Sequence, residues 1–192
     1  MNDAPRQIPA RVLAARRVAD RVGFAENCDD RTGALLRTLA SGKPGGTLLE
    51  LGTGVGVGTA WLLDGMDDRA RLTTIEGRAD RSALAREAIG DDPRVSFVTT
   101  PVGPWLGDYH GPALDLVFVD TYRGKYVERG QLLDRLAPGG FYVGDDLLPQ
   151  PTWAPDQASY VDAFLDEVTR DPTLSVTVLD WSSGLLLATR RT

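Results

Sequence analysis

Short apolar runs alternate with helical stretches along most of this chain, and this alternation limits the fold more than any other feature. Five runs have the length and composition of buried strands, at residues 47–51, 72–75, 95–98, 114–119 and 140–143. Helical segments lie between them. Because parallel neighbouring strands require crossover connections, this order predicts a parallel sheet with helices on both faces.

The N-terminal residues precede the first strand and are expected to form two helices. Apolar residues recur at helical spacing over residues 8–22, among arginines, and again over residues 30–41. Asp29 or Asp30 can cap the start of the second helix, and Gly42 can end it.

The C-terminal half contains two more helical segments and a pair of short strands. We expect helices over residues 125–136 and 156–170, the first ended by Pro138. Residues 174–179 and 185–188 face each other across a short turn, which predicts an antiparallel hairpin.

Together these elements predict an α/β fold: a Rossmann-like, doubly wound sheet of seven strands, mostly parallel, with a C-terminal antiparallel hairpin. A chain of 192 residues suits one domain. We therefore expect a single domain over residues 1–192, with N-terminal helices over 1–42 and an α/β core over 46–192.

Composition and charge narrow the class of protein. With 42% hydrophobic and 25% charged residues the chain resembles a soluble globular protein, and no apolar run approaches the roughly 18 to 20 residues that span a membrane. A net charge of −6 argues against broad contact with nucleic acid. The N-terminus lacks an apolar signal segment and Cys28 is the only cysteine, so we expect a cytoplasmic protein.

A glycine-rich turn directly follows the first predicted strand. Residues 50–56 read Glu-Leu-Gly-Thr-Gly-Val-Gly. Glycines permit a tight turn, allow close approach of a ligand, and leave the N–H groups of the next helix free to donate. The dinucleotide pattern G-x-G-x-x-G is not satisfied, because Thr59 stands at its last position when Gly54 is its first. A connection that binds no ligand is the alternative.

Glu76 ends the next predicted strand. A carboxylate there can accept hydrogen bonds from both hydroxyls of a ribose, each contributing about 1.5 to 3 kcal/mol. Its alternative role is that of a helix cap or a solvated loop residue. The turn and the acid together predict a ligand that contains adenosine.

Two later strands also end in acids: Asp120 follows one, and Asp145 and Asp146 follow the other. If these strands are neighbours, the three carboxylates converge at the edge that carries the glycine turn. Two unit charges about 4 Å apart repel by about 4 kcal/mol at an effective dielectric of 20, so such a cluster needs a proton, a base or a cation. Oxygen ligands favour magnesium or calcium. Helix capping and turn formation are the alternative roles.

These segments resemble class I S-adenosylmethionine-dependent methyltransferases, and specifically the cation-dependent O-methyltransferases of the catechol and caffeoyl-coenzyme A type. The resemblance covers most of the chain. Residues 48–54 match the first motif of that family, residues 118–120 its first metal ligand, and residues 144–148 its second metal segment, with Asp-Asp in place of the usual Asp-Asn.

The resemblance implies methyl transfer from S-adenosylmethionine to a hydroxyl of a small molecule, assisted by Mg²⁺ or another divalent cation. The expected cofactor-binding residues are Glu50, Gly52, Thr53, Gly54, Val55, Gly56, Glu76, Gly77, Val102 and Asp120. The expected metal ligands are Asp120, Asp145 and Asp146.

One departure from the family concerns the general base. The lysine of the family falls on Arg123, which does not deprotonate at working pH. Either Lys125 reaches into the site, or metal-lowered acidity suffices with Arg123 stabilising the oxyanion, or activity is altered or lost. The candidate catalytic residues are Arg123, Lys125 and Asp120.

The acceptor and the partners are less constrained. We expect a small hydroxylated acceptor in a pocket shaped by the loop over residues 147–153, flat if Trp105, Tyr122 and Trp153 form its walls. In the resembling family the segment over residues 26–30 borders the cofactor and the acceptor, and the alternative role of Cys28 within it is that of a small buried residue. The resemblance also suggests a homodimer through the N-terminal helices. The alternatives are a metal-independent enzyme, an RNA-nucleoside methyltransferase, and a non-catalytic binder of S-adenosylmethionine.

Overall fold

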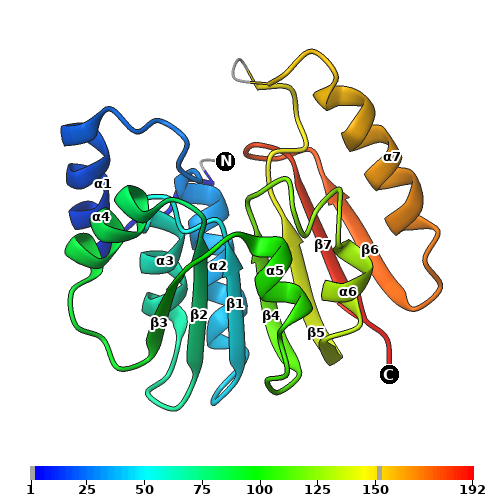
Figure 1. Cartoon of the computed structure of the whole chain (residues 1–192), viewed down its shortest axis with the longest axis horizontal. Coiled ribbons are helices and arrows are strands. Elements are labelled where there is room, and N and C mark those ends of the chain that lie inside the picture. The colour runs from blue at the N-terminus through cyan, green and yellow to red at the C-terminus, as the bar shows by residue number, and fades with distance from the viewer. Residues whose placement is uncertain (1–2, 151–152) are drawn as a thin grey trace.

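The computed structural model describes residues 3–150 and 153–192, and within them the strands form one seven-stranded sheet (Figure 1). The strands are β1 (Thr47–Leu51), β2 (Arg71–Glu76), β3 (Val95–Thr99), β4 (Leu114–Val119), β5 (Leu136–Gly144), β6 (Leu174–Leu179) and β7 (Leu185–Arg190). The helices are α1 (Ala10–Val22), α2 (Asp30–Ser41), α3 (Val57–Gly65), α4 (Ala79–Ile89), α5 (Val102–Gly107), α6 (Arg129–Leu133) and α7 (Gln157–Thr169).

The strand order is β3-β2-β1-β4-β5-β7-β6. Strands β1 to β5 pair in parallel, and β7 lies antiparallel between β5 and β6. The predicted fold class, including the C-terminal hairpin, is therefore confirmed. The chain moves outward in one direction from β1 and in the other from β4, so the carboxyl ends of these two strands form the topological switch point where ligands bind in such sheets.

The helices cover both faces of the sheet, as predicted. Alternate strand residues point to opposite faces, so Leu48 joins a hydrophobic cluster with α1 to α4, while Leu49 joins a second cluster with α5 to α7. Trp61 is fully buried in the first cluster, and Tyr142 and Phe164 fill the second. No helix in the described ranges is long and apolar enough to cross a membrane.

The start of α2 is fixed by its cap, as predicted. One carboxylate oxygen of Asp29 accepts hydrogen bonds from the backbone N–H groups of Arg31 and Thr32, at 2.8 and 2.9 Å. One turn into the helix, a Cβ at Gly33 would overlap the ring of Trp61. The glycine therefore lets α2 pack closely on α3, which holds the first turn of α2 near the carboxyl end of the sheet.

The prediction of a helix over residues 125–136 was wrong. The helix α6 is limited to Arg129–Leu133, and β5 already begins at Leu136. The reason lies in the preceding loop, where Gly124 and Glu128 both have positive φ, +84° and +59°, and so cannot continue a helix. Pro138 does not end a helix but lies inside β5, next to an irregularity in its register with β4.

Candidate functional site

The glycine turn between β1 and α3 adopts a backbone that favours glycine. Gly52, Gly54 and Gly56 have φ values of +98°, +54° and +93°. The N–H of Gly52 donates to the carbonyl of Ile75 at 3.0 Å, and a Cβ at Gly52 would lie 2.6 Å from the carbonyl oxygen of Asp120. The turn thus lies tightly between the ends of β2 and β4. A side chain at Gly52 would have no room.

Glu76 connects this turn to the next helix. Its carboxylate accepts hydrogen bonds from the backbone N–H of Gly54 at 3.0 Å and from that of Arg78 at 2.9 Å. The side chain is 8% exposed. The carboxylate is therefore positioned at the turn by two backbone donors and orders the loop. Its hydrogen bonding to a ribose stays a prediction.

Glu50 lies beneath the turn, fully buried. One oxygen accepts hydrogen bonds from the hydroxyls of Thr59 and Thr74, at 2.5 and 2.6 Å. The other oxygen has no hydrogen-bond partner among the described residues and lies against Gly58. Burial raises the pKa of Glu50 to about 7, although the two threonine hydroxyls oppose the shift.

The acidic strand ends converge as predicted, because β4 and β5 are neighbours. The N–H of Asp120 donates to the carbonyl of Leu51 at 2.9 Å, and the N–H of Asp145 donates to that of Val119 at 3.1 Å. Burial raises the pKa of both carboxyl groups. The charge of Asp146 raises each of them further, and that of Asp145 also raises the pKa of Asp120.

The two basic candidates lie in different environments. Arg123 is half exposed and pairs with the carboxylate of Glu128, away from the acids. Lys125 is only 3% exposed, and its ammonium donates to the backbone carbonyl of Asp145. Its charge lowers the pKa values of Asp120 and Asp145. Lys125 thus lies beside the acids but lines neither cavity, so its catalytic role stays a prediction.

The predicted metal ligands offer carboxylate oxygens, but their side chains are not arranged as a metal site. Across residues 3–150 and 153–192, no group of three or more His, Cys, Asp or Glu side chains is arranged to hold a metal ion. One oxygen of Asp145 already accepts hydrogen bonds from the N–H of Asp146, at 2.8 Å, and from the hydroxyl of Ser183. The nearby ammonium of Lys125 supplies positive charge. A cation at these residues is therefore a proposal.

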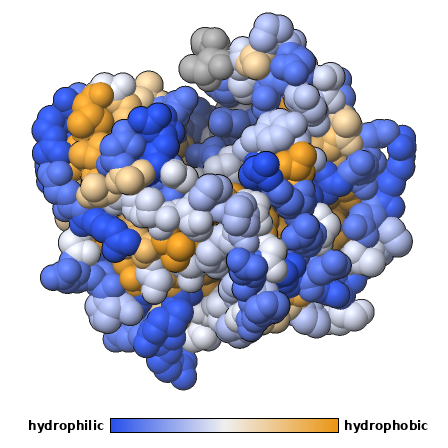
Figure 2. Space-filling model, in the orientation of Figure 1, coloured by the Kyte–Doolittle hydropathy of each residue, from blue (hydrophilic) through white to orange (hydrophobic). Residues whose placement is uncertain are grey.

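A cavity of about 440 Å³ opens beside the acids. Its lining consists of Ala25, Glu26, Asn27, Cys28, Asp29, Asp120, Asp145, Asp146, Gln150, Ser182 and Ser183. The space-filling view is hollowed between the α1–α4 side and the α7 side, with mostly hydrophilic residues around the hollow (Figure 2). A second cavity of about 20 Å³ lies under the glycine turn, lined by Glu50, Gly52 and Gly54 among others. Both cavities share Cys28 and Asp120, so they adjoin.

Several predicted residues line neither cavity. Val102 is buried in the second hydrophobic cluster, and Gly77 is exposed. Five more predicted residues are also absent from both linings: Val55, Gly56, Glu76, Arg123 and Lys125. Trp105, Tyr122 and Trp153 do not line the larger cavity, so the structure gives no support for an aromatic wall.

The sequence missed several residues of the larger cavity. They are Ala25, Ser182 and Ser183. Nothing local in the sequence distinguishes them. The sequence predicted the hairpin turn that contains the two serines, but it did not predict that this turn reaches the acids.

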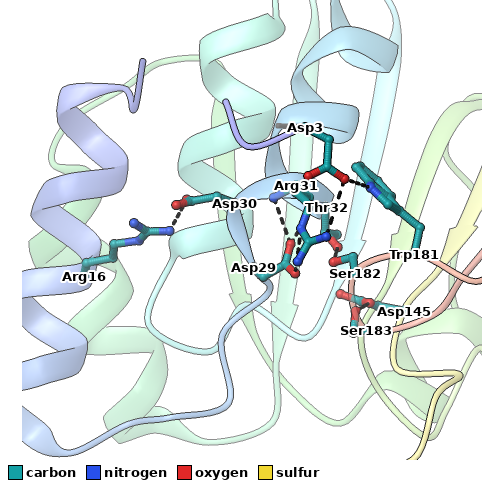
Figure 3. A network of polar contacts seen from close by, with 10 residues as sticks. All are labelled: Asp3, Arg16, Asp29, Asp30, Arg31, Thr32, Asp145, Trp181, Ser182 and Ser183. Carbon is teal, nitrogen blue, oxygen red and sulfur yellow. Dashed lines mark hydrogen bonds and ion pairs between the residues drawn. The ribbon is translucent and has the colours of Figure 1, made fainter. Parts of the chain in front are cut away.

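A network of polar contacts joins the two walls of the larger cavity (Figure 3). The hydroxyls of Thr32, in the first turn of α2, and Ser182, in the β6–β7 turn, are 2.7 Å apart. Asp3 accepts a hydrogen bond from the indole N–H of Trp181 at 2.6 Å and pairs with Arg31. These contacts connect segments that are far apart in the sequence.

The family model described as a methyltransferase domain matches residues 49–147, about half of the chain. The chain belongs to this methyltransferase domain family. The match includes the glycine turn, Glu76 and the acids after β4 and β5. It thus places the predicted features inside the region that defines the family.

Among curated relatives of this methyltransferase-domain chain is a putative O-methyltransferase of Mycobacterium avium, 34% identical over 141 residues, which are 70% of this chain and 62% of that protein. A probable O-methyltransferase of Mycobacterium tuberculosis is 37% identical over 118 residues, 58% of this chain and 52% of that protein. The chain thus spans little more than half the length of these relatives.

Solved structures with similar folds include an O-methyltransferase from Bacillus cereus in complex with SAH, with a TM-score of 0.85 and 21% identity over 98% of this chain and 94% of that one. Another is a putative caffeoyl-CoA O-methyltransferase from Staphylococcus aureus, with a TM-score of 0.79 and 15% identity over 95% of this chain and 93% of that one. Because these identities are low, the likeness shows a shared fold. It confirms that the chain has the fold of the methyltransferases that its sequence resembles.

Proposed function

We propose that the protein transfers a methyl group from S-adenosylmethionine to a hydroxyl oxygen of a small molecule. The observation that carries this proposal is the position of three features at one edge of the sheet: the glycine turn, the carboxylate of Glu76, and the acidic ends of β4 and β5. The glycine turn and the acids line two adjoining cavities at the switch point of the sheet, and Glu76 bonds to the turn from outside both linings. The names of the curated relatives support the same chemistry.

The residues around the smaller cavity would hold the cofactor. Glu76 is positioned to accept hydrogen bonds from ribose hydroxyls, and the positive φ values of Gly52 and Gly54 keep the turn free of side chains. The unpartnered oxygen of Glu50 offers a buried acceptor beneath the turn. When bound, S-adenosylmethionine supplies a methyl group activated by a sulfonium.

The residues of the larger cavity would prepare the acceptor. Asp120 lines both cavities, and its raised pKa makes it a stronger base than an ordinary carboxylate. We assign to Asp120 the proton of the acceptor hydroxyl, whose oxygen then forms a bond to the methyl carbon as the carbon–sulfur bond breaks. The ammonium of Lys125 offsets negative charge that develops nearby.

A divalent cation is a separate part of the proposal. Asp120, Asp145 and Asp146 would hold it, and it would lower the pKa of the acceptor hydroxyl, so that in this route Asp120 would act as a ligand and not as the base. Besides burial, the charges of Asp145 and Asp146 raise the pKa of Asp120, and this repulsion supports a cation. Because the acids do not form a ready metal group, we expect acceptor oxygens to complete the coordination. A metal-free reaction is the second candidate, favoured by the buried ammonium of Lys125.

Calorimetry tests the cofactor first. We expect S-adenosylmethionine to bind, and Glu76→Ala to weaken binding by at least about 150-fold, since two charge-assisted hydrogen bonds of about 1.5 kcal/mol or more are lost. Glu87→Ala is the control, because Glu87 forms an exposed ion pair with Arg21 and lines neither cavity. Absence of binding to the unaltered protein would refute the proposal. Turnover that is unchanged by EDTA would leave only the metal-free route.

A further inference from the structure

The cavity under the glycine turn is much smaller than the cofactor proposed for it. Its volume is about 20 Å³, which gives room for one water molecule, whereas pockets for drug-sized ligands measure about 300 to 1,000 Å³. The larger cavity does not replace it, because none of the described residues that line the larger cavity belongs to the turn. A cofactor that contacts Gly52 and Gly54 therefore requires one wall of the smaller cavity to move.

Most of that wall is fixed by the sheet and by the helix packed on it. Strand β1 pairs with β2 on one side and with β4 on the other. The N–H groups of Gly52 and Thr53 both donate to the carbonyl of Ile75, at 3.0 and 3.2 Å. The lining residues that belong neither to the turn nor to β1, β4 or α3 lie in the loop between α1 and α2: Glu26, Asn27 and Cys28. This loop, residues 23–29, has no regular secondary structure and is the wall that can move.

Phe24 and Arg81 fasten the loop over the turn. A Cβ at Gly54 would lie 3.2 Å from the ring of Phe24, so the ring lies against the turn. The guanidinium of Arg81, in α4, is 4.8 Å from the centre of the same ring and pairs with the carboxylate of Glu26 at 3.1 Å. One side chain of α4 thus holds two residues of the loop.

These contacts are of the kind that opens readily. The side chain of Arg81 is 33% exposed and that of Glu26 is 59% exposed, and cation–π contacts and ion pairs at exposed sites are each weak. The loop begins at Gly23, where φ is +66° and a Cβ would meet no atom within 4 Å. It ends at Asp29, the cap of α2. A glycine in open space at one end of the loop is suited to a hinge.

We propose that the α1–α2 loop is a gate of the cofactor site and that Arg81 is the positioning residue that holds it closed. The cofactor enters when Phe24 leaves Gly54 and Arg81 releases Glu26. The inference rests on the proposed binding of S-adenosylmethionine at the turn and adds the route by which it reaches the turn. Because only the open fraction of the protein can bind, a change that weakens the closed state raises the observed association rate constant.

The first experiment measures association rates by surface plasmon resonance, with S-adenosylhomocysteine as the probe over immobilised protein. We expect Arg81→Met, which loses both contacts, to raise the association rate constant about fivefold. Arg81→Lys keeps a charge for Glu26 but loses the planar stacking on Phe24, and should raise it about twofold. Arg86→Met is the matched control: Arg86 also belongs to α4 and lies 5.0 Å from the centre of a ring, that of Phe97, which is in β3 and not in the loop. Its rate constant should stay that of the unaltered protein.

Hydrogen exchange of the peptide over residues 23–29 gives an independent readout. The N–H of Phe24 donates to the carbonyl of Ala19 at 2.9 Å, and its exchange should be faster in Arg81→Met but not in Arg86→Met. An association rate constant in Arg81→Met that is equal to or below that of the unaltered protein would overturn the gate. So would equal increases in the Arg81 and Arg86 variants, because these would report general loosening. Absence of binding to the unaltered protein would instead refute the proposed function, on which the gate depends.

Discussion

The buried ammonium of Lys125 makes a specific contribution that can be measured. Lys125→Met keeps most of the volume of the side chain and removes its charge. The ammonium donates to the carbonyl of Asp145 and lowers the pKa values of Asp120 and Asp145. Loss of a charge-assisted hydrogen bond costs about 1.5 to 3 kcal/mol. We therefore expect the free energy of unfolding at pH 8 to fall by about 2 to 3 kcal/mol.

The pH dependence of this destabilisation tests the electrostatic role of Lys125 more directly. Asp120 and Asp145 have pKa values raised by folding, so the native state binds more protons than the unfolded state. Their protonated forms favour folding, and this contribution is lost as pH rises from near 4, the unfolded value, through the folded values. Lys125→Met raises the folded values further. The destabilisation caused by the variant should therefore be smaller at pH 5 than at pH 8.

A matched control exists in Lys43. Its ammonium also donates to a backbone carbonyl, that of Gly139 at 2.7 Å, and lies 4.5 Å from the centre of the Phe141 ring. It is not among the groups that shift the pKa of Asp120 or Asp145. Urea unfolding of both Lys→Met variants, in EDTA at pH 5 and pH 8, should show a pH-dependent loss for Lys125→Met alone. An equal loss at both pH values would refute the electrostatic role of Lys125.

Three further substitutions test the parts of the site separately. Glu50→Gln removes a carboxyl whose pKa is raised to about 7, so its stability relative to the unaltered protein should increase as pH rises from about 4.5 to 7, as followed by urea unfolding. Gly52→Ala places a Cβ 2.6 Å from the carbonyl oxygen of Asp120 at a φ of +98°, and calorimetry should show the loss of S-adenosylmethionine binding. Thr32→Val removes the contact with Ser182 and should lower the free energy of unfolding by about 1 kcal/mol, whereas unchanged thermal and urea midpoints would show that the contact contributes nothing.

The fold was predictable because its signals are local. The strand β1, the glycine turn and α3 follow one another within a short stretch of the sequence. The positive φ values of the turn favour glycine, so the turn can be recognised from its glycines. The cap of α2 at Asp29 is equally local. The convergence of Asp120 with Asp145 was also predictable, since strand ends of a doubly wound sheet share one edge.

The composition of the larger cavity was not predictable in this way. Ser183 reaches Asp145 only because β7 inserts between β5 and β6, which brings the β6–β7 turn beside the end of β5. Glu26 belongs to the loop between α1 and α2, which has no regular pattern. Such contacts depend on tertiary packing, which periodicity does not encode.

The exchange of roles between Arg123 and Lys125 shows the same limit at the level of one loop. From spacing alone, Arg123 takes the place of the lysine in the resembling family. In the structure, Gly124 has a φ of +84°, and a Cβ there would lie 2.6 Å from Leu51, so the loop turns sharply at this residue. The turn sends Arg123 outward to Glu128 and Lys125 inward to Asp145. Two positions that differ little in the sequence thus become one exposed cation and one buried cation. The buried one, Lys125, lowers the pKa values of Asp120 and Asp145, where we place the reaction.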